Sequence, residues 1–146
     1  MEEGIKKGLE ERFGAAVSNV VIPRPRRMFA DVPREKLLEV LSHIKDKMGF
    51  THLSTITGLD AGDHLEALYH TASKTVSLSV RVKLPTEDPK IPSVLSVYPG
   101  AEFYEKELED LVGVVVDGLP QGRRYPLSED WPKDEHPLRK SWVKAG

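Results

Sequence analysis

Apolar residues recur with helical spacing in three segments of the chain. In residues 31–48 they follow the 3.6-residue period after an Asp-Val-Pro start, and Gly49 stands where a helix ends. Apolar residues occur at every fourth position among the charges of residues 2–13, which predicts a shorter amphipathic helix. A third helix is expected over residues 101–112, with Gly113 ending it.

Apolar and polar residues alternate strictly in residues 75–84, the pattern of a strand with one buried and one solvated face. Half-apolar runs at residues 50–59 and 64–71 precede it, and turn residues separate the three segments. Three successive strands joined by short turns predict an antiparallel meander. Shorter runs predict further strands at residues 16–22, 26–30 and 114–116.

Proline divides the chain into a body and a tail. Of the 11 prolines, three precede residue 84 and eight follow it, so regular structure is expected mainly in the first part. For residues 1–117 we predict an α+β fold, with a mostly antiparallel or mixed sheet and two main helices packed on it. Periodicity stops after residue 117, and residues 118–146 are predicted to form an extended, irregular tail.

Composition narrows the chemistry. The 146 residues carry 21 Lys and Arg against 23 Asp and Glu, a net charge of −2, and no cysteine. The chain therefore forms no disulfide, thiolate zinc site or cysteine-ligated iron–sulfur cluster. The longest uncharged stretch, residues 48–59, is shorter than the roughly 20 apolar residues of a spanning helix, and the charged N-terminus lacks a signal-peptide core. A soluble chain is expected.

Histidine residues offer one candidate site. His64 and His70 lie six apart on one predicted strand and share a face, so a two-histidine metal patch is conceivable. No third ligand with suitable spacing accompanies them, which favours ordinary polar residues on the solvated side of a sheet. His43 stands beside charged residues in the second helix, and we expect it to be solvated.

Acidic residues cluster in the third predicted helix, where Glu102, Glu105 and Glu109 share one stripe. Paired carboxylates can act as acid and base or bind a hard cation, but such a run is more often a solvated face. A third interpretation, charge-paired docking of the helix and the tail on each other or on a partner, fits better here because the tail supplies basic residues. The basic residues of the tail are Arg123, Arg124, Arg139 and Lys140.

A basic cluster near the start of the chain suggests RNA or another anionic ligand. Its members are Arg24, Arg26, Arg27, Arg34 and Lys36. The negative net charge and the lack of a recognisable binding motif argue against nucleic acid. A small enzyme that uses Glu105 or Glu109 with His136 is a further alternative.

The tail carries the residue types that dominate protein interfaces. Trp131, Trp142 and the His-Pro-Leu-Arg-Lys segment at residues 136–140 lie in a region whose pattern predicts no independent fold. Aromatic and arginine anchors supply most of the binding energy in interfaces. The residues alone therefore favour an interaction subunit over a catalyst.

Several motifs resemble those of a known family, beginning with residues 81–88 (RVKLPTED) and Pro92-Ser93-Val94. Residues 105–113 (EKELEDLVG) resemble the acidic motif of the respiratory complex I 30 kDa subunit, a soluble component of NADH:quinone oxidoreductase with relatives in membrane-bound energy-converting hydrogenases. The arginine pair at 123–124, Trp131 and residues 135–140 (EHPLRK) follow in the family's order. The resemblance covers roughly residues 50–142.

The chain departs from the family's pattern at several positions. Lys106 replaces the usual arginine, Leu119 replaces a histidine, and Tyr125-Pro126 replaces apolar residues after the arginine pair. The sequence also ends soon after Lys140. These departures favour a compact, archaeal member from a hydrogenase-type complex over the NADH-linked version.

The resemblance implies a non-catalytic structural subunit in the peripheral arm of an ion-translocating membrane oxidoreductase, on the cytoplasmic side of the cell membrane. The expected complex is an energy-converting membrane-bound hydrogenase or a related ferredoxin-dependent complex; an NADH/quinone-type complex I is the alternative. The expected partners are a hydrogenase-large-subunit-like protein and iron–sulfur subunits. These partners would hold the iron–sulfur clusters and any nickel–iron centre. In this chain we expect no cofactor, metal, nucleic acid or direct membrane contact. Partner contacts are expected at Glu105, Glu107, Asp110, Arg123, Arg124, Trp131, His136, Pro137, Leu138, Arg139 and Lys140.

Overall fold

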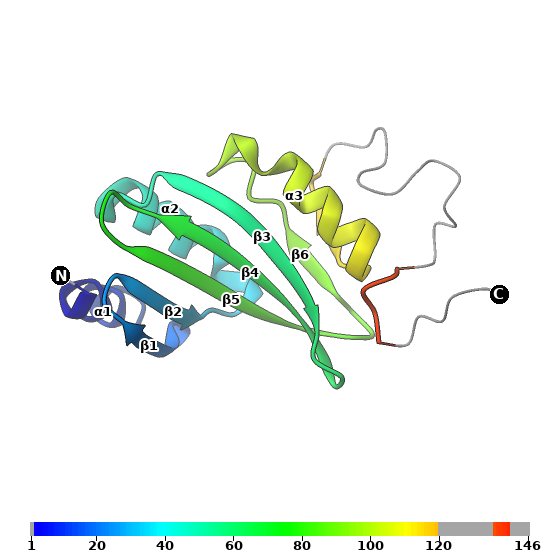
Figure 1. The fold of residues 1–146 in the computed structure, drawn as a ribbon, viewed down its shortest axis with the longest axis horizontal. Helices are drawn as coiled ribbons and strands as arrows, with labels where there is room; N and C mark the ends of the chain where they lie inside the picture. Colours follow the sequence, from blue (N-terminus) through cyan, green and yellow to red (C-terminus); the bar gives the residue numbers. More distant parts are fainter. Residues whose placement is uncertain (1, 120–135, 141–146) are drawn as a thin grey trace.

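A five-stranded sheet forms the centre of the computed structural model, which describes residues 2–119 and 136–140 (Figure 1). The helices are α1 (Glu2–Phe13), α2 (Leu37–Met48) and α3 (Glu102–Glu107). A π-helical turn, Leu108–Val112, continues α3, and short 3-10 turns occupy Gly14–Ala16, Arg34–Lys36 and Pro99–Ala101. The strands are β1 (Ser18–Arg24), β2 (Arg27–Asp31), β3 (His52–Asp60), β4 (His64–Ala72), β5 (Ser77–Pro85), β6 (Lys90–Pro92) and β7 (Val115–Asp117).

The main sheet has the strand order β1-β2-β5-β4-β3. Strands β3, β4 and β5 pair antiparallel, which confirms the predicted meander. Strand β2 pairs with β5 in parallel, with Met28 opposite Leu78 and Ala30 opposite Val80, so the sheet is mixed. The α+β prediction is confirmed. Alternation of apolar residues specifies the buried face of a strand but not its neighbour, and the parallel contact was therefore not predicted.

Strand β1 begins and ends later than the sequence predicted, at Ser18 and Arg24, and it includes Pro23. The strand lies at one edge of the sheet, where the N–H that proline lacks is tolerated. Its pairing with β2 is irregular on both sides of Val21. The turn into β2 places Arg26 in the left-handed region, with φ +66°.

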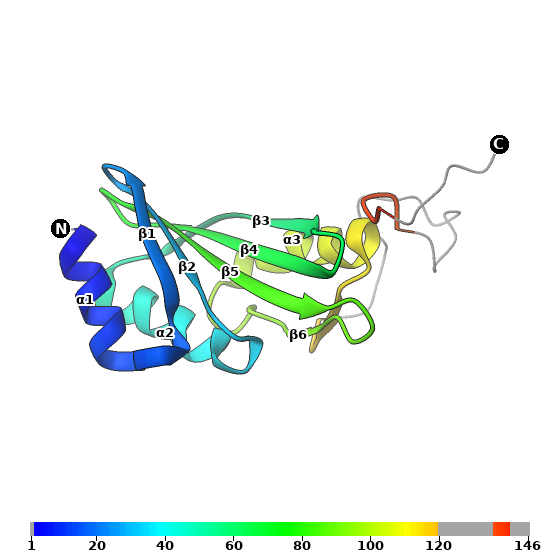
Figure 2. The ribbon, with the colours of Figure 1, turned by 90° about the horizontal axis from the view of Figure 1, so that it is seen from below.

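Helices α1 and α2 cover one face of the main sheet (Figure 2). The core between them is made of fully buried apolar side chains, among them Leu9 from α1, Leu41 and Ile44 from α2, and Leu78 and Val80 from β5. Burial of this continuous apolar surface is the main driving force for the fold.

The start of α2 differs from the prediction. Asp31 does not begin the helix; it ends β2, and its Oδ1 accepts a hydrogen bond from Nε of Arg81 at 2.7 Å. A 3-10 turn at Arg34–Lys36 follows, and α2 begins at Leu37. The predicted end is confirmed, because Gly49 adopts φ +80° directly after the helix.

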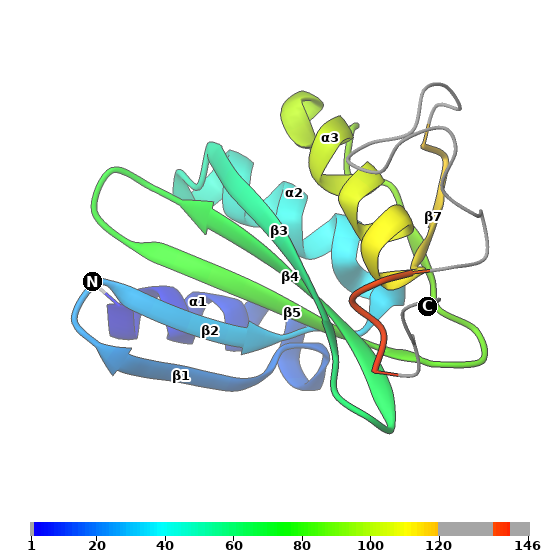
Figure 3. The same ribbon diagram turned by 45° about the vertical axis from the view of Figure 1, so that its right-hand side comes forward.

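Helix α3 lies beside strand β3, with the small parallel sheet of β6 and β7 behind it (Figure 3). Strand β7 was predicted, whereas β6 falls in a proline-rich stretch for which a loop was predicted. Tyr104 packs against the core, and Phe103 is 57% exposed. No helix in the described part of the chain is long and apolar enough to cross a membrane.

Candidate functional site

The C-terminal end of the α3 helix is the point where the tail returns to the body. The last carbonyl groups of a helix have no partner within it, and something else must satisfy them. Residues 136–140, which we call the strap, fill this role (Figure 3). The Asp110 carbonyl accepts from Nδ1 of His136 (2.9 Å), the Leu111 carbonyl from the Leu138 N–H (2.7 Å), and those of Val112 and Gly113 from the Arg139 guanidinium.

The local sequence explains the shape of the strap. The Arg139 N–H donates to the His136 carbonyl at 3.0 Å, which closes a turn with Pro137 at its second position. Proline favours this position because its ring fixes φ near the value that the turn needs. The turn directs the His136 ring, the Leu138 N–H and the Arg139 guanidinium toward the same helix end.

Gly113 makes the close approach of the strap possible. Its φ of +82° is a conformation that L side chains rarely adopt, and a Cβ at this position would lie 2.7 Å from Cδ2 of His136. A second Cβ contact, at 3.0 Å, would involve Nη2 of Arg139. Glycine is therefore required here for two independent reasons.

The far end of the strap binds the turn between β3 and β4. The Lys140 N–H donates to Oδ2 of Asp60 at 2.7 Å, and the Gly62 N–H donates to Oδ1 of the same carboxylate at 2.9 Å. These backbone hydrogen bonds, that of Lys140 above all, lower the pKa of Asp60. The strap is thus held by helix carbonyl groups at one end and by the Asp60 carboxylate at the other.

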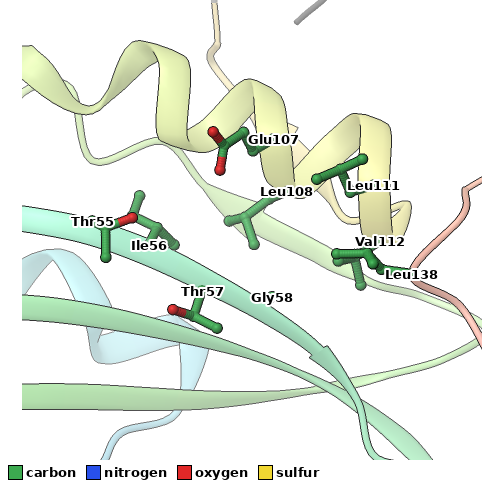
Figure 4. Close-up of a pocket in the computed structure, with 9 residues that line it drawn as sticks. All are labelled: Thr55, Ile56, Thr57, Gly58, Glu107, Leu108, Leu111, Val112 and Leu138. Carbon is green, nitrogen blue, oxygen red and sulfur yellow. The ribbon is translucent and has the colours of Figure 1, made fainter. Parts of the chain in front are cut away.

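A cleft of about 200 Å³ lies between β3, the helix end and the strap (Figure 4). Strand β3 is an edge strand, and α3 packs along it, which protects the edge from uncontrolled pairing. Gly58 permits the contact, because a Cβ there would lie 2.5 Å from Cγ2 of Val112. Leu138 lies at the rim of the cleft beside Val112 and is 53% exposed.

Glu105 is not part of a solvated acidic face, contrary to the sequence prediction. Its side chain is completely buried, Oε1 accepts from the Ser93 hydroxyl at 2.7 Å, and Oε2 accepts from the Val94 N–H at 2.9 Å. Burial raises the pKa of Glu105. The reason for the difference is positional, because Glu105 shares the inward face of the helix with Leu108 and Val112, at i+3 and i+7.

The other acidic residues of the helix have separate environments. Oε2 of Glu109 accepts from the Val116 N–H at 3.1 Å, and burial raises the pKa of Glu109. Glu102 forms an ion pair with Lys106 at 3.3 Å, and Glu107 lines the cleft. The backbone carbonyl of Asp110 accepts a hydrogen bond from His136 of the strap.

Docking of tail on body does occur in the described part of the chain, but not by the expected charge pairing. Arg139 binds main-chain carbonyl groups in place of carboxylates, and Lys140 contributes its backbone N–H. Arg123, Arg124 and Trp131 lie outside the described residues, and their roles stay predictions.

The histidines occupy three different environments. His43 was expected to be solvated, but its ring packs edge-on against Phe13 at 5.4 Å, and burial lowers its pKa. His64 and His70 share the outer face of β4, as predicted. His64 binds Glu66 (2.7 Å) and Asp63 (2.6 Å), whose carboxylates raise its pKa. Within the described part of the chain, no group of three or more possible ligands is arranged to hold a metal ion.

The remaining alternatives lose support from these contacts. His136 binds the backbone of the helix end, and Glu105 and Glu109 bind Ser93 and backbone N–H groups, so the residues named for acid–base catalysis are each engaged elsewhere. Two members of the basic cluster are neutralised, because Arg34 pairs with Asp88 and Lys36 pairs with Glu39, which weakens the case for a nucleic-acid surface.

Comparison with known proteins identifies the family. The model of the family described as "Respiratory-chain NADH dehydrogenase, 30 Kd subunit" matches residues 30–146. The chain belongs to this family. The resemblance inferred from the acidic motif and the strap is confirmed.

Relatives within the 30 kDa subunit family come from several kinds of oxidoreductase complex. A subunit of the F(420)H(2) dehydrogenase of Methanosarcina mazei is 37% identical over 142 residues, 94% of this chain and 89% of the relative. A subunit of the NADH-quinone oxidoreductase of Saccharopolyspora erythraea is 34% identical, and the match spans 99% of this chain but only 61% of that protein. This chain is therefore a subunit of a complex-I-like oxidoreductase.

Two solved structures share the fold of this chain. A chain in the membrane-bound sulfane sulfur reductase, an archaeal respiratory membrane complex, superposes with a TM-score of 0.85 at 25% identity, covering 97% of this chain and 85% of that one. A trypsin-resistant fragment of Nqo5 superposes with a TM-score of 0.70 at 28% identity, covering 84% of this chain and all of the fragment.

Two features of the site were not foreseen from the sequence. The motif residues of the strap were expected to contact a partner, and their role in completing a helix of this same chain was missed. Asp60 was predicted only as a turn residue, although its carboxylate anchors Lys140. Gly113 could have indicated the role of the strap, because a glycine directly after a helix marks a chain reversal that leaves the last carbonyl groups of the helix exposed.

Proposed function

We propose that this chain is a non-catalytic structural subunit in the peripheral arm of an ion-translocating membrane oxidoreductase. It would bind the subunit related to the hydrogenase large subunit and hold it beside the iron–sulfur subunits, whose clusters carry the electrons. Its place would be the cytoplasmic side of the membrane, with membrane contact only through its partners. The family relationship supports this role.

The proposal rests on the hydrogen bonds that the family's polar motif residues form with backbone groups. Glu105 accepts from the Val94 N–H, His136 donates to the Asp110 carbonyl, and Arg139 donates to the Val112 carbonyl. A catalytic group needs a free face toward a substrate. Side chains that instead complete backbone hydrogen bonds build a rigid surface, which is what a structural subunit offers its neighbours.

The docking surface that we propose combines the rim of the cleft with the tail, residues 118–146. Leu138 is 53% exposed, although its backbone is fixed by the bond to the Leu111 carbonyl. An apolar side chain presented from a rigid backbone loses little conformational entropy on binding, which favours its use as a contact. Glu107 and Leu111 border the same cleft.

Within the family, we propose an energy-converting hydrogenase or a related ferredoxin-dependent complex over an NADH/quinone-type complex I. Similarity to the archaeal sulfane sulfur reductase chain and to the F(420)H(2) dehydrogenase subunit supports this choice. Two of the residues that depart from the family pattern also have suitable partners in the structure. Lys106 pairs with Glu102 and lies 5.9 Å from the Phe103 ring centroid, and Leu119 is 5% exposed within the apolar core.

Substitution of Leu138 tests the docking role. We expect Leu138→Asp to weaken assembly by at least about 30-fold, since burying an unpaired carboxylate in an apolar contact costs about 2 kcal/mol or more. The fold should persist, because the Leu138 N–H still reaches the Leu111 carbonyl. The measurement is co-purification of a tagged full-length chain with its native partners, alongside far-ultraviolet circular dichroism.

Val21→Asp is the matched control, because Val21 is 49% exposed and lies on β1, away from the strap. Normal assembly of Leu138→Asp, or equal loss in both variants, would refute a docking role of the strap. Mass spectrometry of the co-purified subunits tests the finer assignment. We expect a large subunit with two Cys-x-x-Cys motifs, whereas an NADH-binding subunit would overturn the hydrogenase-type proposal.

A further inference from the structure

A second cleft lies on the outer face of the main sheet, the face that carries no helix in the described part of the chain (Figure 2). It has a volume of about 310 Å³ and is lined by hydrogen-bonding side chains from β2 to β5. Thr55 is the one residue that it shares with the cleft beside the strap. The role proposed above makes no use of it.

Strand register brings the lining residues together. Arg27 on β2 lies opposite Ser77 on β5, and Ser79, two residues further along β5, lies opposite His70 on β4. These residues alternate with the buried apolar positions of the same strands, so their side chains point away from the core. One cation and several hydroxyl groups therefore share one small area.

Arg27 has no acidic partner in the described part of the chain. Its guanidinium lies over the Phe29 ring at 5.4 Å, and no carboxylate among those residues pairs with it. Arg81, on the same outer face, contrasts with it, because Asp31 and Glu66 both pair with Arg81. A guanidinium offers a planar set of N–H donors that matches carboxylate and phosphate groups.

Hydroxyl groups hold the His70 ring in place at one side of the cleft. The Ser79 hydroxyl lies 2.7 Å from Nδ1 of His70, and the Thr57 hydroxyl lies 2.9 Å from Nε2. Burial, with the nearby Arg27 charge, lowers the pKa of His70, which favours the neutral ring. A neutral imidazole donates through one nitrogen and accepts through the other, so both hydroxyls can bond to it. The His70 ring is therefore a fixed reporter beside Arg27.

We propose that this cleft binds a single oxyanion group, a phosphate or a carboxylate, between the Arg27 guanidinium and the Ser77 hydroxyl. The guanidinium supplies the charge, and the Ser77 hydroxyl supplies a directional hydrogen bond. Phosphate can arrive free in solution, and a carboxylate can arrive on a small acid. The two sources differ in geometry and can be distinguished with the isolated chain.

The test is a nuclear magnetic resonance titration of the isotope-labelled full-length chain with sodium phosphate, and separately with sodium acetate. Ionic strength is held constant with chloride, which removes general screening as a cause. We expect saturable shifts of the His70 ring and of the Ser77 and Ser79 amide signals. Arg27→Gln should weaken binding at least about tenfold, because a charged hydrogen-bond partner is lost.

Arg12→Gln is the matched control, since Arg12 is an exposed arginine over an aromatic ring, that of Phe13 at 5.0 Å, and it lies on α1 and does not line the cleft. Saturation with either anion that is lost in Arg27→Gln but retained in Arg12→Gln supports the site, and the preferred anion identifies the source. Shifts that fail to saturate, or that weaken equally in both variants, overturn the proposal. Circular dichroism verifies that both variants fold.

Discussion

Substitution of Gly113 by alanine separates the role of the strap from that of the glycine backbone. Two costs arise at this position. An alanine at φ +82° costs about 1–2 kcal/mol, and its Cβ meets the His136 ring at 2.7 Å. The ring must then move, and the hydrogen bonds to the Asp110, Leu111, Val112 and Gly113 carbonyls are strained or lost.

Gly118 provides a control with the same backbone strain but no clash. It adopts φ +91°, and a Cβ there would lie 3.7 Å from Cβ of Ser93, an ordinary contact distance. We expect Gly118→Ala to lower the free energy of unfolding by about 1–2 kcal/mol. Gly113→Ala should lower it by a further 2–4 kcal/mol or so, since each of four hydrogen bonds contributes about 1 kcal/mol.

Urea unfolding followed by circular dichroism at 222 nm measures both variants. With a slope of about 2 kcal/mol per molar urea, the extra loss in Gly113→Ala corresponds to a midpoint about 1–2 M lower than in Gly118→Ala. Equal midpoints in the two variants would show that the strap contributes nothing to the stability of the helix end, and the reasoning would be wrong.

Two further predictions concern the helix and the strand that it covers. Gly58→Ala should lower the free energy of unfolding by about 1–3 kcal/mol, because its Cβ would lie 2.5 Å from Cγ2 of Val112. Gly4→Ala in α1 is the control: a Cβ there would have nothing within 4 Å, and the substitution should raise the free energy of unfolding by about 0.5–1 kcal/mol in the same urea assay. Burial raises the pKa of Glu105, so its folded state binds the proton more tightly and loses stability as pH rises above about 4.5. Glu105→Gln, which does not titrate, should therefore gain stability relative to the native chain between pH 4 and pH 7, and a change in the opposite sense would contradict the burial argument.

Periodic segments of the body were predictable from the sequence because their patterns are long. The five alternating apolar positions of residues 75–84 defined β5, and the apolar stripe of residues 37–48 defined α2. Strand β6 has three residues, Lys90–Pro92, which is too short for any period to show. Its existence depends on β7, more than twenty residues later, and such a contact leaves no local signal.

The candidate site was predictable in its location but not in its chemistry. The acidic helix and the strap were both singled out, yet opposite charges suggested ion pairs where Arg139 binds carbonyl groups. A charge pattern does not reveal that helix ends also attract donors. The prediction for Glu105 was wrong because five acidic residues in one helix favour solvent, although its spacing from Leu108 and Val112 already matched the apolar face.

Completion of α3 by the strap has a consequence for synthesis of the protein on the ribosome. The helix end at Gly113 leaves the ribosome before His136 and Arg139 do, by about 1–5 s at typical rates of elongation. During that interval the terminal carbonyls of the helix lack the donors that later satisfy them. A partner that recognises the finished helix end would therefore select chains in which residues 136–140 have been made over chains truncated before them.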